Sequence, residues 1–380
     1  MKTRKLQQVG GGTYTVSIPK EWADEHALEA GMELNLYTHS DGSIVVRTEA
    51  RDGGDLAGAR IAVSGEAPEL VERVLRAAHA VGFETVTLVP DGAFTGAQRR
   101  AARSVVRDLV GTDLLVERSE EITVQHLLDA STVSVRQSVV QLQFTALSVH
   151  REATAAVVGG DVQADRVRER GAEAERLARM VRRHAARSLT SFEELDRLGV
   201  SRTELFDYGA TARALRRVAG EAVRTAEAAQ RLSRPLPEEV ATTVRETAEG
   251  ARTVVDEATT AVLDGPDAPA AHTALDRRDE TVATVTAATD ALFDASATPF
   301  DGAVVGATDG GHVPPTDSGR DQPTDGGVAT AAAASRVLDT VRRTADCGGT
   351  IADVALQAAV RAGDDRATGS TSATPGCRDR

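Results

Sequence analysis

The sequence predicts a multidomain chain that consists of a small β head, an α/β module and an all-α body of six helices. Apolar and polar residues alternate within residues 1–47 with the period of a half-buried strand. In residues 58–122, short apolar runs alternate with stretches of helical spacing, which is typical of α/β folds. From about residue 124 onward, Ala, Arg, Glu and Leu dominate, and Gly- and Pro-rich breaks divide the chain into helix-length pieces.

The head is expected in residues 1–47. Apolar residues occupy every second position of residues 14–18 after a run of glycines, and Pro19 ends this strand because it has no N–H to donate. A short helix from Glu21 to Leu28 and a hairpin with an Asp41-Gly42 turn should follow. A unit of roughly 40 residues is near the lower limit for unassisted folding, so we expect a homodimer.

The charge of the head differs from that of the chain. The chain has 57 acidic and 44 basic residues and a net charge of −13. Residues 1–20 contain Lys2, Arg4, Lys5 and Lys20 but no acidic residue. Such a patch, doubled in a dimer, would bind DNA phosphates with an affinity that falls as salt rises. A solvated N-terminal tail would also account for these charges.

Residues 13–22, followed by residues 31–34, resemble the AbrB/SpoVT swapped-hairpin DNA-binding domain. The resemblance implies that two chains interlace their hairpins into one small barrel that contacts DNA through basic residues. By position, the implied DNA contacts are Arg4, Lys5 and Lys20. The implied core residues are Trp22, Leu34 and Ile44.

The next segment, 48–57, is predicted to be a linker, and residues 58–122 are predicted to form the α/β module. Apolar spacing predicts helices over Pro68–Val81 and Thr95–Leu109. The module has neither a dinucleotide fingerprint nor a P-loop, so we expect it to be a spacer or a dimerisation platform.

The body is expected to contain two three-helix repeats, 124–232 and 235–363. The breaks predict helices over Val124–Val158, Asp161–Ser188, Arg202–Leu232, Pro237–Leu263, Ala268–Ala295 and Val328–Ala362. An acidic insert, 298–327, and the tail, 364–380, are expected to be disordered.

Acidic residues recur at four-residue spacing in the second predicted helix, at Asp161, Asp165 and Glu169. This spacing stacks the side chains on one face, where like charges repel unless a cation neutralises them. Neighbouring arginines could supply that charge. A hard metal cation with oxygen ligands could also do so.

Two acidic pairs, Asp161/Asp165 and Asp276/Glu280, and the run 341–355 resemble the PhoU family of phosphate-uptake regulators. The order of the domains resembles that of haloarchaeal-type chains with an AbrB-like head and a PhoU-like body. The resemblance implies metal ions, often iron or zinc, on acidic helix faces, and oxygen ligands would also suit magnesium. The implied ligands are Asp161, Asp165, Asp276, Glu280, Asp346 and Asp353. Two departures from the family pattern are Thr284, which stands where a further acid is expected, and the interruption at residues 347–349.

Several classes of protein are disfavoured. The chain has no apolar run of 18 or more residues and no signal peptide, so we expect a cytoplasmic protein without membrane insertion. Cys347 and Cys377 lack the spacing of a disulfide framework or a zinc knuckle. An acidic, lysine-poor composition with 3% aromatic residues is typical of halophilic proteins. No catalytic motif was found, so we expect no enzyme, and His150 is interpreted as an ordinary surface histidine rather than a phosphoacceptor.

The predicted function is therefore a DNA-binding transcriptional regulator of phosphate uptake and phosphate homeostasis that senses its effector through the helical body. The alternative is a regulatory adaptor that does not bind DNA and docks on a phosphate ABC transporter or a signalling protein.

Overall fold

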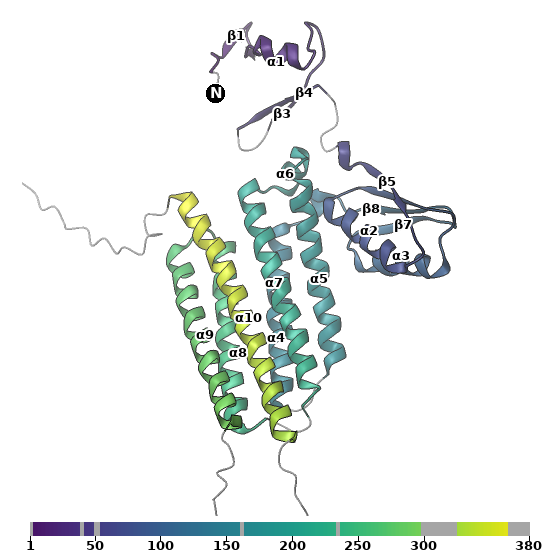
Figure 1. The fold of residues 1–380 in the computed structure, drawn as a ribbon. Helices are drawn as coiled ribbons and strands as arrows, with labels where there is room; N and C mark the ends of the chain where they lie inside the picture. The colour runs from purple at the N-terminus through teal and green to yellow at the C-terminus, as the bar shows by residue number, and fades with distance from the viewer. Residues whose placement is uncertain are drawn as a thin grey trace, which may run out of the picture. The chain divides into compact units, whose positions relative to one another are not determined.

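The multidomain fold predicted from the sequence is confirmed. A computed structural model describes residues 3–38, 42–48, 54–159, 163–232, 236–297 and 325–363. The chain divides into two compact units, 1–54 and 55–380. The first unit is the small β head, and the second contains the α/β module and the helical body (Figure 1).

The head consists of two small hairpins and one short helix. Its elements are β1 (Gln7–Val9), β2 (Thr13–Thr15), α1 (Lys20–Glu25), β3 (Asn35–Thr38) and β4 (Ile44–Arg47). β1 pairs antiparallel with β2, and β3 pairs antiparallel with β4. Helix α1 ends before the predicted Leu28 because Ala27 takes a φ of +53°, outside the right-handed helical region. Asp41 of the predicted turn and residues 49–53 of the predicted linker lie outside the described residues.

The α/β module is one mixed sheet with two helices. Its elements are β5 (Gly58–Val63), α2 (Pro68–Val81), β6 (Thr85–Pro90), α3 (Gly96–Asp108), β7 (Thr112–Glu117) and β8 (Ile122–His126). The strand order is β5-β6-β8-β7, in which β5 and β6 are parallel and the other pairs are antiparallel. Alternate strand residues such as Leu88 and Ile122 pack against buried residues of the two helices, such as Val71 and Val105.

The predicted helix over Val124–Val158 begins later than expected. Residues Ile122–His126 form β8 instead, and a 3-10 turn, η2 (Ala130–Thr132), follows before the helix starts at Val135. β8 lies between β6 and β7, so the β-branched residues at its start pair on both sides. The module therefore extends to His126 rather than ending at residue 122.

The body contains six long helices and one short one within the described residues. They are α4 (Val135–Gly159), α5 (Ala164–Arg187), α6 (Phe192–Leu198), α7 (Arg202–Ala229), α8 (Glu238–Leu263), α9 (Ala268–Ala297) and α10 (Asp325–Ala362). The short helix α6 was not predicted. Residues 298–324 of the predicted insert and the tail 364–380 lie outside the described residues. In the part of the chain that is described, none of the helices combines the length and apolarity needed to cross a membrane.

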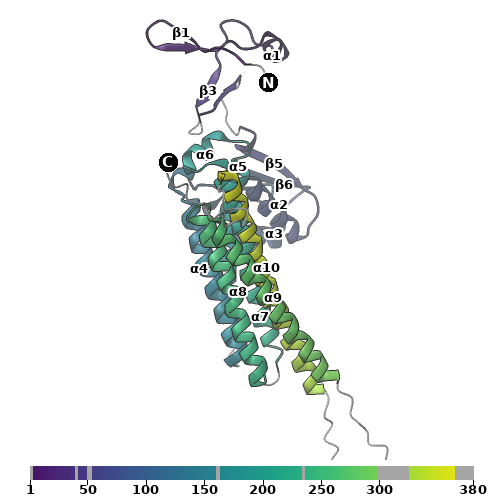
Figure 2. The ribbon, with the colours of Figure 1, turned by 90° about the vertical axis from the view of Figure 1, so that its left-hand side faces the viewer.

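The long helices form two groups of three that lie side by side (Figures 1 and 2). Helices α4, α5 and α7 pack against one another, and so do α8, α9 and α10. Between the groups, α7 packs along α10 and α4 packs along α8. The first helices of the two groups therefore meet, as do the third helices, which is the arrangement expected of two related halves.

Small residues allow the helices of the body to approach closely. Gly348 of α10 lies against α8, where a Cβ at this position would be 2.6 Å from Val254 Cγ1 and 3.0 Å from the Val255 backbone nitrogen. Gly348 is one of the two glycines that interrupt the run 341–355, and its contact with α8 leaves no room for a side chain. This contact explains the glycine at that position.

We predict that Gly348→Ala destabilises the body by about 1–3 kcal/mol, because a methyl group would push α10 away from the α8 backbone. The matched control is Gly220→Ala in α7, where nothing lies within 4 Å of the added Cβ. That change should stabilise the helix by about 0.5–1 kcal/mol. Urea unfolding followed by far-UV circular dichroism measures both, and equal effects of the two substitutions would contradict the close contact.

Candidate nucleic-acid interface

The three predicted DNA-contact residues are exposed in the head. Arg4 and Lys5 lie directly before β1, and Lys20 begins α1. Arg4 donates a hydrogen bond from Nη1 to the neighbouring Thr3 carbonyl at 3.3 Å. Among the described residues, none of the three cations forms an ion pair with a carboxylate. Their charges therefore stay available to an external anion such as a DNA phosphate.

The described residues of the head form no interior of their own. Every described residue of the head is at least partly exposed. Its apolar side chains with exposed fractions between 40% and 66% are Leu6, Val9, Tyr14, Val16, Ile18, Met32, Leu36 and Ile44. A soluble protein rarely leaves so many large apolar groups of one small unit in water.

The core predicted for the head is therefore not formed within one chain. Trp22 and Leu34 are only half-buried, and Ile44 is 65% exposed. Ile44 and Leu36 belong to the same face of the β3–β4 hairpin, because Leu36 is opposite Val46 and Thr38 is opposite Ile44. Ile44 was predicted as a core residue of a barrel made by two chains, so its exposure in a single chain does not test that prediction.

A family comparison supports the AbrB-like assignment of the head. Residues 7–53 match the family model described as antidote-toxin recognition MazE, bacterial antitoxin. The match includes Lys20, begins after Arg4 and Lys5, and does not extend into the α/β module or the helical body. No curated protein matches the chain.

The predicted metal ligands that lie in the described part of the chain do not form a cluster of three or more. Within the described residues, no group of three or more His, Cys, Asp or Glu side chains lies close enough to hold a metal ion. Asp276 and Glu280 of α9 and Asp353 of α10 are exposed. Asp161 lies outside the described residues.

Two of the predicted ligands have arginine partners instead. Arg168, which lies one helical turn after Asp165 in α5, donates from Nη1 to Asp165 Oδ1 at 2.5 Å. Asp346 lies 3.5 Å from Arg342 Nη1 and 3.7 Å from Arg278 Nε, so it forms ion pairs within α10 and with α9. These contacts favour the interpretation that arginines neutralise the acidic faces, and metal binding stays a prediction.

His150 and Cys347, which were also considered from the sequence, lie in the interior of the body. Cys347 is a free thiol whose pKa is raised to about 11, chiefly by burial. His150 is fully buried, so the interpretation of this residue as a surface histidine is wrong. Arg252 Nη1 donates to His150 Nδ1 at 3.3 Å, which requires an unprotonated nitrogen there.

Burial lowers the pKa of three histidines to about 3: His79, His126 and His150. For His150, the nearby charges of Arg252 and then Arg151 add to the effect of burial. The three imidazoles therefore stay neutral in the folded protein at pH values where an ordinary histidine with a pKa of 6.5 is protonated.

We predict that the free energy of unfolding decreases as the pH falls from about 6.5 toward 3, because the unfolded chain then binds protons that the folded chain does not. Each buried histidine contributes up to about 1.4 kcal/mol per pH unit. His150→Gln should make this dependence shallower by up to that amount, whereas His26→Gln, at an exposed position, should not. Urea unfolding at several pH values measures the slopes. A His150→Gln slope equal to that of the wild type would rule out a neutral buried imidazole.

Proposed function

We propose that the protein is a dimeric DNA-binding transcriptional regulator that contacts the phosphate backbone through Arg4, Lys5 and Lys20. The observation that carries the proposal is that the head, which matches the MazE antitoxin model over residues 7–53, begins with a basic segment, residues 1–20, that contains no acidic residue. Backbone contacts of this kind give affinity and register, and sequence is read by further contacts to the bases.

The dimer follows from the exposed apolar groups of the head. A second head that covers Leu36, Ile44 and their neighbours would supply the missing layer of a core, as the resemblance to swapped-hairpin domains implies. It would also double the number of cations that face DNA.

The helical body is proposed to sense phosphate status and thereby to regulate phosphate uptake and phosphate homeostasis. Support comes from the resemblance of its acidic pairs to the PhoU family and from the packing of its helices as two groups of three. A regulatory role without catalysis agrees with the lack of a recognisable catalytic motif in the sequence. Coupling requires that the effector bind two arrangements of the body with different affinity.

We predict that the full chain binds DNA from its own upstream region and from phosphate-transporter promoters more tightly than scrambled DNA. Arg4→Ala/Lys5→Ala should weaken binding to all sequences, because phosphate contacts are lost. If both heads of a dimer bind, the slope of log affinity against log salt should decrease by about 3–4, since each lost contact contributes about 0.9.

Fluorescence anisotropy with labelled duplexes over a salt series measures these quantities. The control is Arg107→Ala/Arg118→Ala, which removes the same charge from exposed positions of the α/β module. Equal effects of the two double substitutions would contradict a DNA interface at the start of the head. An absence of sequence-specific binding at every salt concentration would favour the adaptor, with a transporter or a signalling protein as its partner.

We also predict that Leu36→Asp weakens association of the heads by at least about 2 kcal/mol, because a carboxylate would have to lose water in an apolar interface. Trp22 is the only tryptophan of the chain, so its fluorescence reports on the head alone. Thermal unfolding seen by this fluorescence should depend on protein concentration in the wild type and in the control Asn35→Asp, which changes the opposite face of β3, but not in Leu36→Asp. Concentration-independent unfolding of the wild-type head would argue against the dimer.

A further inference from the structure

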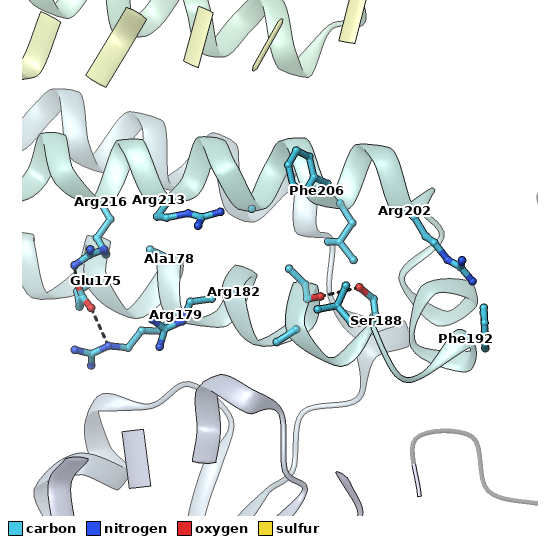
Figure 3. A pocket seen from close by; sticks show the side chains of 15 residues that line it. Glu175, Ala178, Arg179, Arg182, Ser188, Phe192, Arg202, Phe206, Arg213 and Arg216 are labelled. Atoms are coloured by element: carbon cyan, nitrogen blue, oxygen red, sulfur yellow. Dashed lines mark hydrogen bonds and ion pairs between the residues drawn. The ribbon is translucent and has the colours of Figure 1, made fainter. Parts of the chain in front are cut away.

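A cavity of about 500 Å³ lies along α5 and α7, and its far end reaches α6 (Figure 3). Five arginines line it, whereas Glu175 is the only acidic residue in the lining. The arginines are Arg179, Arg182, Arg202, Arg213 and Arg216. The cavity lining is therefore positively charged, although the chain as a whole has a net charge of −13.

Three of the five arginines already have partners. Glu175 accepts hydrogen bonds from Arg179 Nε at 2.9 Å and from Arg216 Nη1 at 3.2 Å, at one end of the cavity (Figure 3). At the other end, the Arg202 guanidinium carbon lies 4.4 Å from the centroid of the Phe192 ring. These contacts fix the side chains that close the two ends.

The remaining two arginines, Arg182 of α5 and Arg213 of α7, come from facing helices (Figure 3). Neither forms an ion pair with any carboxylate among the described residues. Guanidinium groups bind carboxylate and phosphate oxygens with two parallel hydrogen bonds, so an anion between them would have donors on both sides.

The rest of the lining is apolar. Leu205 forms a buried part of the wall, and Phe206 and Leu189 line it with exposed fractions of 62% and 85%. Ser188 is the only neutral side chain in the lining with a polar group, and its hydroxyl already donates to the Ala185 carbonyl at 2.8 Å. A bound molecule with a polar body would therefore lose hydrogen bonds to water without replacing them.

We infer that this cavity binds a small amphipathic organic anion. Its acidic group, a carboxylate or a phosphate, lies between Arg182 and Arg213, and its apolar body covers Leu205 and Phe206. The volume is within the range of about 300–1,000 Å³ that is usual for small-molecule sites. The inference does not depend on the proposed DNA binding of the head, because every residue of the cavity belongs to α5, α6, α7 or the turn between α5 and α6.

Isothermal titration calorimetry of the full chain with decanoate and with decyl phosphate tests the inference and distinguishes the two kinds of head group. At least one of them should bind, whereas decyltrimethylammonium, which has the same tail with a positive head, should not. Acetate, which lacks the tail, and ATP, which has a polar body, should bind at least about tenfold more weakly. Failure of both decyl anions to bind, or equal binding of the decyl cation, would overturn the inference.

Arg182→Gln and Arg213→Gln should each weaken binding of the decyl anion at least about tenfold, since a charge-assisted hydrogen bond is lost. Both side chains are exposed, so the fold should tolerate the change, which circular dichroism verifies. The control is Arg217→Gln, an exposed arginine of α7 that does not line the cavity. Unchanged affinity in both cavity variants would overturn the inference. Phe206→Ser tests whether a second copy of the chain covers the cavity instead. If this variant forms a smaller oligomer than the wild type and neither decyl anion binds the wild type, a second copy is the occupant and the inference is overturned.

Discussion

Arg183 of α5 attaches the α/β module to the helical body. Its side chain is 1% exposed, and it donates from Nη1 to the His79 carbonyl at 3.0 Å and from Nη2 to the Phe83 carbonyl at 2.9 Å. His79 lies in the last turn of α2 and Phe83 directly follows its C-cap residue. The last carbonyls of a helix lack partners within the helix, and the helix dipole favours a cation there. Burial lowers the pKa of Arg183 to about 10, which still leaves the group charged near neutral pH. The buried charge is thus stabilised by two backbone carbonyls and by the nearby carboxylates of Glu194 and Glu84.

Arg187, one turn further along α5, extends this junction to α6. It donates to the Gly82 carbonyl at 2.7 Å and to Glu194 Oε2 at 3.1 Å, and the other oxygen of Glu194 lies 2.6 Å from His184 Nδ1. Burial acts to raise the pKa of Glu194, but His184 and Arg187 lower it by more than burial raises it, so the net shift is downward. Gly82 is needed here because a Cβ would lie 2.3 Å from Arg187 Cγ. The same contacts that hold the module therefore hold α6, which carries Phe192 and closes one end of the arginine-lined cavity.

Sequence patterns predicted the elements better than the contacts between them. The apolar spacing of Pro68–Val81 predicted α2 to its ends, because a helix that buries one face repeats every 3.6 residues. Residues 124–126 of β8 were predicted as the start of a helix, because their strand state depends on pairing with β6 and β7. For the sites, exposure of Arg4 and Lys5 follows from charge. Burial of His150 and the joining of Arg183 to α2 come from residues about 100 positions apart, which no local pattern reveals.

The helical body and the head place different demands on oligomerisation. The body packs apolar side chains into a core of its own, although a few such as Phe206 stay exposed, whereas the head leaves groups such as Leu36 and Ile44 exposed and buries none of its described residues. In the proposed dimer, the head would be complete only where two chains meet, so its cations would act in pairs.

Each chain has a net charge of −13, so the proposed dimer would be repelled from DNA at long range at low salt. Salt shortens that repulsion, to a Debye length of about 3 Å at 1 M, while the cations at the start of the head still reach phosphates at contact distance. High salt therefore removes the long-range penalty of the acidic chain while it weakens the contact interaction, so affinity should fall with salt less steeply than the number of phosphate contacts alone implies.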